Sequence, residues 1–212
     1  MSGFSVSEKI DSEVVQTFRS ARHGRPEGLH YTVLTDLIAC VSAINGLSLM
    51  TTEEATVCAR LTALGIPFTR HEHPAAATVE EAEPHWADID AMHFKNLFLR
   101  NQKGSRHYLV IIRHLKRADL RAIADQIGDG KLSFGSPERL KTHLGVMPGS
   151  VSPFGLIHDP THQVRVIIDG DLKSAARVSF HPNINTVTLT MARSDFERFL
   201  ADCGNPVRYV RV

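Results

Sequence analysis

Apolar and polar positions alternate in the centre of the chain in a way that predicts two neighbouring strands. In residues 93–99 successive side chains point to opposite faces, and Phe94 and Phe98 share one of them. A second apolar run covers residues 108–112. The segment between the two runs is turn-like, and Gly104 within it is free to adopt a positive φ. The pattern therefore predicts a β-hairpin.

Lys95 interrupts the apolar pattern of the first strand. It shares a face with Leu97 and Leu99, although lysine is depleted in strands and is rarely buried without a partner. One interpretation is an edge-strand lysine that blocks aggregation, or one whose stem extends to water. The other is an ammonium group held beside an anionic or carbonyl-bearing ligand, with Asn96 as a neutral donor and acceptor. The pattern by itself leaves both interpretations open.

Short helices and strands are expected along the rest of the chain, without a regular βαβ rhythm. Capping-box spacing at Thr51 and again at Thr78 marks two helix starts, and Ser136 and Ser194 are expected to cap two more helices. We expect helices over residues 7–20, 34–47, 51–64, 78–82, 118–127, 136–144 and 195–203, and further strands over residues 67–73, 132–134, 164–168, 178–181, 186–190 and 207–212. The mixture indicates an α/β protein.

Composition and charge exclude several classes of protein. The chain has 24 Lys and Arg residues against 23 Asp and Glu residues, which argues against a strongly basic coat for nonspecific nucleic-acid binding. It has no run of 18 apolar residues, so no transmembrane helix is expected. The three cysteines have no metal-type spacing and follow no secretory signal, which fits a reduced compartment. A cytoplasmic protein without association with membranes is therefore expected.

Two later stretches add to the pair Lys95 and Asn96. Residues 149–153 have Gly-x-x-x-Pro spacing, which taken alone also fits an ordinary connecting loop, and His181 is followed by Pro-Asn. In this order the three stretches resemble the YbaK/prolyl-tRNA-synthetase editing-domain superfamily. The chain is most similar to its free-standing PrdX (ProXp-ala) branch, which removes alanine wrongly attached to proline tRNA. The resemblance runs from about residue 50 to residue 212.

The resemblance implies both a fold and an activity. The implied fold is α/β (α+β), with a mixed, partly barrel-like sheet surrounded by helices. The implied activity is trans-editing deacylation, in which the ester of mischarged tRNA is hydrolysed without a metal or other cofactor. Ala-tRNA(Pro) is the expected substrate, because a synthetase pocket built for proline cannot exclude the smaller alanine. Alternatives are a deacylase for Cys-tRNA(Pro) or another misacylated tRNA, a non-catalytic module that binds tRNA or a synthetase, and a hydrolase of an unrelated small ester.

The resemblance also assigns site residues. Lys95 is expected at the terminal phosphate or ester of the substrate, Asn96 at the carbonyl and the attacking water, and His181 in the pocket wall, where it binds the substrate's amino group while neutral. Backbone N–H groups of residues 149–153, the glycine loop, would help to position the ester. The expected substrate-binding residues are Gly149, Ser150, Val151, Ser152, Pro153, Phe154, Gly155, Phe180 and Asn183. Phe94, Phe98, Phe154 and Phe180 are candidates for the size limit, and core packing explains them equally well.

The densest basic cluster of the sequence follows the predicted hairpin and consists of Arg113, Lys116, Arg117 and Arg121. It is either a solvated face or a set of phosphate contacts to the tRNA acceptor stem. The expected partners are mischarged tRNA(Pro) and, secondarily, prolyl-tRNA synthetase, with no role for DNA. A monomer or weak dimer is expected.

The resemblance divides the chain into two parts. Residues 50–212 form the expected editing domain. Residues 1–49 are expected to be an N-terminal extension, helical or poorly ordered, and Met50 is a candidate alternative start. An alternative role for residues 1–49 is contact with a regulatory partner.

Overall fold

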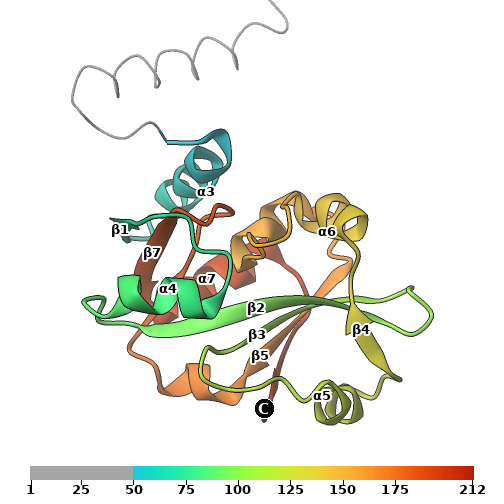
Figure 1. Cartoon of the computed structure of the whole chain (residues 1–212). Helices are drawn as coiled ribbons and strands as arrows, with labels where there is room; N and C mark the ends of the chain where they lie inside the picture. The colour runs from blue at the N-terminus through green and yellow to red at the C-terminus, as the bar shows by residue number, and fades with distance from the viewer. Residues whose placement is uncertain (1–49) are drawn as a thin grey trace, which may run out of the picture. The chain divides into compact units, whose positions relative to one another are not determined.

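The computed structural model describes residues 50–212, and the helices expected over residues 7–20 and 34–47 lie outside the described residues. In chain order the elements are α3 (Thr52–Ala63), β1 (Thr69–Glu72), α4 (Val79–Trp86), β2 (Met92–Asn101), β3 (His107–Arg113), α5 (Leu120–Ile127), β4 (Leu132–Phe134), α6 (Pro137–Leu144), η2 (Pro153–His158), β5 (Val164–Asp169), η3 (Gly170–Ser174), β6 (Arg177–Phe180), β7 (Val187–Ala192), α7 (Arg193–Cys203) and β8 (Val207–Val210), as Figure 1 shows. None of the described helices is long and apolar enough to cross a membrane.

The strands form one mixed sheet in the order β1-β7-β6-β2-β3-β5-β8, and β4 pairs with β2 outside this path. The predicted hairpin is confirmed, because β2 and β3 are antiparallel with Lys95 opposite Ile112. Gly104 in the turn has a φ of +68°. The β2–β6, β3–β5 and β5–β8 pairs are parallel. The expected α/β fold, with a mixed sheet and surrounding helices, is thus confirmed.

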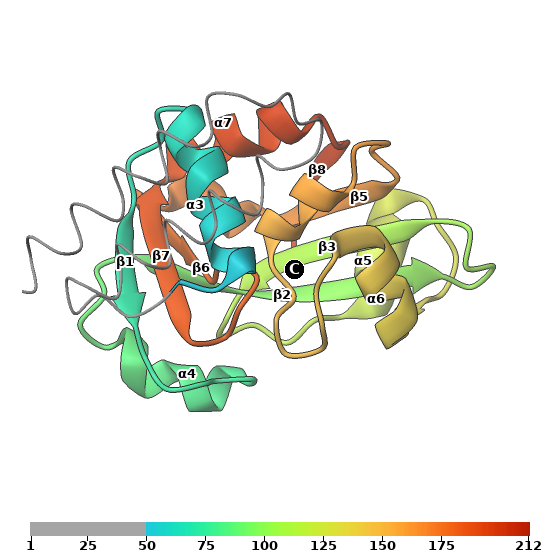
Figure 2. The same cartoon turned by 90° about the horizontal axis from the view of Figure 1, so that it is seen from above.

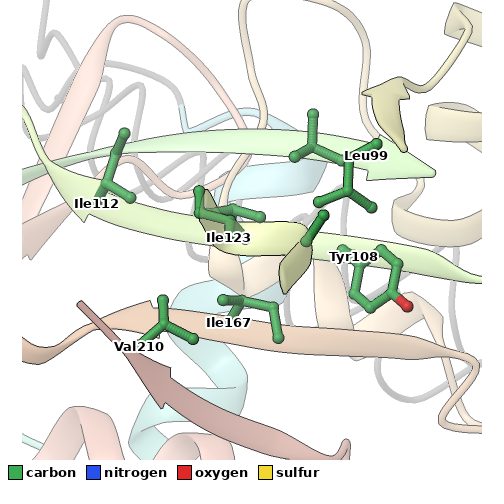
Figure 3. Close-up of a cluster of buried hydrophobic side chains, with 9 residues drawn as sticks. Leu99, Tyr108, Ile112, Ile123, Ile167 and Val210 are labelled. Carbon is green, nitrogen blue, oxygen red and sulfur yellow. The ribbon is translucent and has the colours of Figure 1, made fainter. Parts of the chain in front are cut away.

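Buried side chains pack on both faces of this sheet. On one face Ile123 of α5 packs with Leu99, Ile112 and Ile167, which come from three neighbouring strands (Figure 3). Elsewhere in the core, aromatic rings join α7 to the sheet and to η2. Phe196 of α7 stacks on Phe180 of β6 with ring centroids 4.4 Å apart. Burial of these large apolar surfaces is the main source of the fold's stability.

Strand β2 lacks a second neighbour along its middle. At its start Met92 and His93 pair with β6, and at its end residues 99–101 pair with β4. Between these two pairings, residues 94–98 have a described strand on the β3 side alone. Lys95 and Asn96 therefore lie beside a break in the sheet, where other segments of the chain can approach them.

Helix caps explain where most helices begin, with one exception to the expectation. The side chains of Thr51, Thr78 and Ser136 cap α3, α4 and α6 as predicted. The expectation that Ser194 caps the last helix is wrong. Helix α7 starts at Arg193 directly after β7 and has no side-chain cap. A cap there is unnecessary for the Arg193 N–H, because it donates to a backbone carbonyl, that of residue 176, at 3.1 Å.

Candidate active site

A cavity of about 180 Å³ lies where α4 and the segment before it face β2 and the glycine loop. Figure 2 shows α4 beyond the end of β1, well apart from α5 and α6. The cavity combines small apolar side chains with a few polar groups and the aromatic side chains of Trp86 and Phe94. Its lining consists of Ala76, Ala77, Thr78, Val79, Ala82, Trp86, Phe94, Lys95, Asn96, Gly149, Val151 and His181.

One face of α4 and the residues before it form the first wall. Val79, Ala82 and Trp86 follow one another at helical spacing, so all three side chains lie on one face of the helix. The start of the helix is fixed by the Thr78 cap, whose hydroxyl accepts from the Glu81 N–H, and the Glu81 carboxylate accepts in turn from the Ala77 N–H, one residue before the cap, at 2.7 Å. These bonds hold the wall in place. The part of the wall before the start of the helix consists mainly of small side chains.

The glycine loop forms the opposite wall and needs its first residue to be glycine. Gly149 has a φ of +84°, and a Cβ there would lie 3.3 Å from the Ala77 Cβ. The loop is also tied to the segment that carries His181. The Ser152 hydroxyl donates to the His181 carbonyl at 2.6 Å and accepts from the Phe154 N–H at 3.2 Å. Two of the three sequence motifs are therefore joined by a direct hydrogen bond.

Several polar atoms around the cavity have no partner among residues 50–212. Lys95 forms no salt bridge with any residue that the structure describes. Asn96 Oδ1 and His181 Nδ1 are both shielded from solvent, and neither has a hydrogen-bond partner among the described residues. Buried polar atoms are paired in most native proteins, so unpaired ones around a cavity indicate a place for a ligand. This arrangement favours the ligand interpretation of Lys95.

His181 is neutral at neutral pH. Burial lowers its pKa to about 4, and the nearby His73 contributes to the same shift. A neutral imidazole accepts a hydrogen bond at one nitrogen and donates at the other, so it can hold an uncharged polar group of a ligand.

The structure brings together five of the twelve catalytic and substrate-binding residues named from the sequence. Lys95, Asn96, Gly149, Val151 and His181 line the cavity. The other seven do not line it, and these are Ser150, Ser152, Pro153, Phe154, Gly155, Phe180 and Asn183. All of these except Ser150 are buried.

Sequence reasoning did not identify one whole wall of the cavity. The lining residues 76–79, Ala82 and Trp86 were not among the named site residues. The capping-box spacing at Thr78 located the start of α4 without showing that this helix borders a cavity. The helical spacing of Val79, Ala82 and Trp86 was the available signal for which face lines the cavity.

The basic cluster is only partly free to contact a ligand. Lys116 is paired with Asp169 at 2.9 Å and with Asp171 at 3.0 Å. Arg117 and Arg121 are exposed and form no salt bridge within the described part of the chain. Of the cluster, these two are therefore the most available to phosphate groups. No group of three or more His, Cys, Asp and Glu side chains arranged to hold a metal ion occurs in residues 50–212.

Comparisons with known proteins agree on one family. Residues 73–199 match the family model described as the aminoacyl-tRNA editing domain. The chain is 39% identical over 158 residues to the prolyl-tRNA editing protein ProX of Acetoanaerobium sticklandii, covering 74% of this chain and 95% of that protein. It is 33% identical over 150 residues to the prolyl-tRNA synthetase associated domain-containing protein 1 of Bos taurus, covering 69% of this chain and 87% of that protein.

A comparison with solved structures supports the same fold. A protein described as a proposed trans-editing enzyme for prolyl tRNA synthetase superimposes with a TM-score of 0.58 and 23% identity, covering 77% of this chain and 99% of that chain.

Proposed function

The chain belongs to the aminoacyl-tRNA editing domain family, and we propose that it is a trans-editing deacylase that hydrolyses mischarged tRNA(Pro), with Ala-tRNA(Pro) as its main substrate. The observation that carries the proposal is the cavity itself, in which Lys95, Asn96 Oδ1 and His181 Nδ1 face a small space without an ion-pair or hydrogen-bond partner among the described residues. The name of the ProX relative, a prolyl-tRNA editing protein, supports the choice of tRNA.

The reaction is the hydrolysis of the ester between the amino acid and the terminal ribose. A water oxygen adds to the carbonyl carbon, and the carbonyl oxygen becomes an oxyanion. The C–O bond to the ribose then breaks, and the ribose oxygen takes up a proton. Groups that stabilise the oxyanion usually supply the largest part of such catalysis. In our proposal Lys95 supplies positive charge at the ester or the adjoining phosphate, and Asn96 orients the carbonyl and the water.

His181 acts in this scheme as a neutral binding group rather than as a charged one. Because its pKa is about 4, its imidazole can accept a hydrogen bond from the amino group of the substrate. We expect the hydrolysis rate to show no inflection from His181 between pH 5.5 and pH 8. A fall in the rate is expected only as the pH approaches 4, where the imidazole takes up a proton.

The size and lining of the cavity support the selection of a small amino acid in this proposal. Its volume of about 180 Å³ is below the range of roughly 300–1,000 Å³ that is usual for sites of drug-sized ligands. Ala76, Ala77 and Ala82 line it, and larger side chains there would leave less space. A pocket of this kind separates substrates by size, because a group that does not fit cannot reach the catalytic residues.

The test is parallel deacylation of Ala-tRNA(Pro), Cys-tRNA(Pro) and Pro-tRNA(Pro) by the full chain. We expect rapid loss of alanine, little loss of proline, and a rate at least 100-fold lower for Lys95→Ala, as for the removal of one oxyanion-stabilising group. Lys103→Ala is the matched control, because Lys103 is exposed in the β2–β3 turn. Selective loss of cysteine would instead identify a Cys-tRNA(Pro) deacylase. Binding of tRNA without any hydrolysis would identify a non-catalytic module.

A further inference from the structure

Trp86, the single tryptophan of the chain, lies at the end of α4 and lines the cavity. It is half-exposed, whereas most large apolar side chains of the domain are buried. Tryptophan offers the largest aromatic surface of any side chain, so its presence at a site calls for an explanation in terms of packing or ligand binding. No step of the proposed hydrolysis uses it.

Two histidines hold the indole ring in one orientation. The His93 ring stacks on Trp86 with centroids 4.5 Å apart and an interplanar angle of 4°, and the His114 ring meets it edge-on at 5.5 Å. His93 is itself fixed by a hydrogen bond of 2.6 Å between its Nδ1 and the Ser179 hydroxyl. Its carbonyl also accepts from the His114 N–H at 3.1 Å. The indole is therefore pre-organised, and little conformational entropy is lost when a planar ligand stacks on it.

The position of Trp86 separates it from the small-residue end of the cavity. Val79 and Trp86 are seven residues apart on α4, and a rise of 1.5 Å per residue places them about 10 Å apart along the helix axis. Ala77 and Gly149 meet beyond the Val79 end. A small amino acid fits the alanine-lined end, and a planar group attached to it would extend toward the tryptophan end.

The geometry points to Trp86 as the platform on which the 3′-terminal adenine of the aminoacyl-tRNA stacks. This inference rests on the proposed function, because the terminal adenosine carries the ester that would be hydrolysed. A cavity of about 180 Å³ cannot enclose the amino acid and the nucleoside together, so the base must lie at its rim. Aromatic platforms of this kind bind bases of nucleic acids through their π-faces.

The surroundings of Trp86 suit a nucleotide better than a larger amino-acid side chain. His114, which contacts the indole edge, opens the loop that carries the exposed Arg117. A tRNA chain that runs from Trp86 in this direction would bring one of its phosphates toward the exposed guanidinium group of Arg117. A role in amino-acid selection would instead make Trp86 a size filter, and the experiment separates these two roles.

The first arm of the test uses tryptophan fluorescence, which reports on Trp86 alone. Adenosine 5′-monophosphate is titrated into the full chain, with ribose 5-phosphate as the control that lacks a base. We expect saturable quenching by the nucleotide and none by the sugar phosphate. The absence of quenching up to millimolar nucleotide would overturn the inference, and it would do so even if the protein had no hydrolytic activity.

The second arm measures kcat and KM with Ala-tRNA(Pro) and with the same tRNA made abasic at its last nucleotide. Stacking of one base is worth about 1–3 kcal/mol, so Trp86→Ala should lower kcat/KM by about 5- to 150-fold, mainly through KM. Trp86→Phe should retain most of the activity. Removal of the base should lower kcat/KM of the wild type by a similar factor, and it should leave kcat/KM of Trp86→Ala almost unchanged.

Equal effects of base removal on the wild type and on Trp86→Ala would overturn the inference while leaving the deacylase intact. A Trp86→Ala variant that gains activity on larger amino acids at unchanged KM would also overturn it, in favour of a size filter. Complete inactivity of the wild type on every aminoacyl-tRNA would reject the proposed function instead, and the fluorescence arm would still decide whether Trp86 binds a base.

Discussion

Replacement of Gly149 by alanine should damage both the stability and the activity of the protein. Gly149 combines a φ of +84° with a close approach of the glycine loop to Ala77, where an added Cβ would lie 3.3 Å from the Ala77 Cβ. Both features belong to the boundary of the cavity, since Gly149 and Ala77 both line it. The substitution therefore tests whether the backbone conformation of the loop sets the geometry of the site.

The expected magnitude can be built from its parts. A left-handed conformation costs an L-residue roughly 1–2 kcal/mol. The lower entropy of the unfolded chain offsets about 0.4–1 kcal/mol of this cost, which leaves a net loss of about 1 kcal/mol. Crowding against Ala77 adds about 1 kcal/mol, at the low end of values for overpacking. We expect Gly149→Ala to lower the free energy of unfolding by about 2 kcal/mol, as measured by urea denaturation.

Two other glycines provide matched controls. Gly128 also has a positive φ of +69° but no atom within 4 Å of an added Cβ, so Gly128→Ala should lose only the conformational part, about 1 kcal/mol. Gly130 has neither feature, and the free energy of unfolding of Gly130→Ala should lie within about 0.5 kcal/mol of the wild-type value. Neither residue lines the cavity, so both variants should hydrolyse Ala-tRNA(Pro) at the wild-type rate.

Activity provides the second measurement for Gly149→Ala. A displacement of a catalytic wall by a fraction of an ångström should lower kcat/KM about tenfold or more. Adding Ala77→Gly should relieve the crowding and restore part of the activity, while the conformational loss of stability should remain. The reasoning is refuted if Gly149→Ala unfolds like the wild type and also hydrolyses the substrate at the full rate.

Three further outcomes are expected. Arg117→Ala should weaken tRNA binding and reduce the salt dependence of its affinity by about one unit of slope, whereas Lys116→Ala should mainly lower stability, because Lys116 is paired with two aspartates. His93 and His107 have pKa values lowered to about 4, chiefly by burial, so the unfolded chain binds more protons than the folded chain between about pH 6.5 and pH 4. The free energy of unfolding should decrease as the pH is lowered through that window, by up to about 1.4 kcal/mol per pH unit for each imidazole. NMR titration should find neither ring titrating near pH 6.5. A chain that starts at Met50 should retain full deacylase activity, and a large loss of rate would assign a functional role to residues 1–49.

The sequence predicted the secondary structure well where local rules decide it. Alternation placed β2 and β3, and side-chain caps at Thr78 and Ser136 placed the starts of two helices. The rule failed at Ser194, because the Arg193 N–H finds a partner in a distant segment of the backbone. A pattern read along one segment contains no information about such a partner. The order of strands in the sheet likewise depends on contacts between segments far apart in the chain.

The site was predicted in part for a related reason. Lys95 stood out because its charge conflicts with its strand, and conflicts of this kind are expected at functional positions. Phe154 and Phe180 were expected to bind substrate, yet both are buried in aromatic contacts, with ring centroids 6.3 Å apart. Trp86 was not identified, although its spacing from Val79 was visible, because nothing in the sequence shows which face of a helix meets a cavity rather than the core.

The break in the sheet beside β2 links these observations. A second strand along residues 94–98 would pair the backbone there and cover Lys95 and Asn96, and the cavity would not exist. The side-chain atoms Asn96 Oδ1 and His181 Nδ1 border this opening without a partner among the described residues, and each carries an energetic cost of about 1–3 kcal/mol because it is buried. A bound substrate would recover that cost for Asn96 and His181, since its ester and amino group supply the missing partners. The same opening that lowers the stability of the free protein would thus contribute to its affinity for an aminoacyl ester.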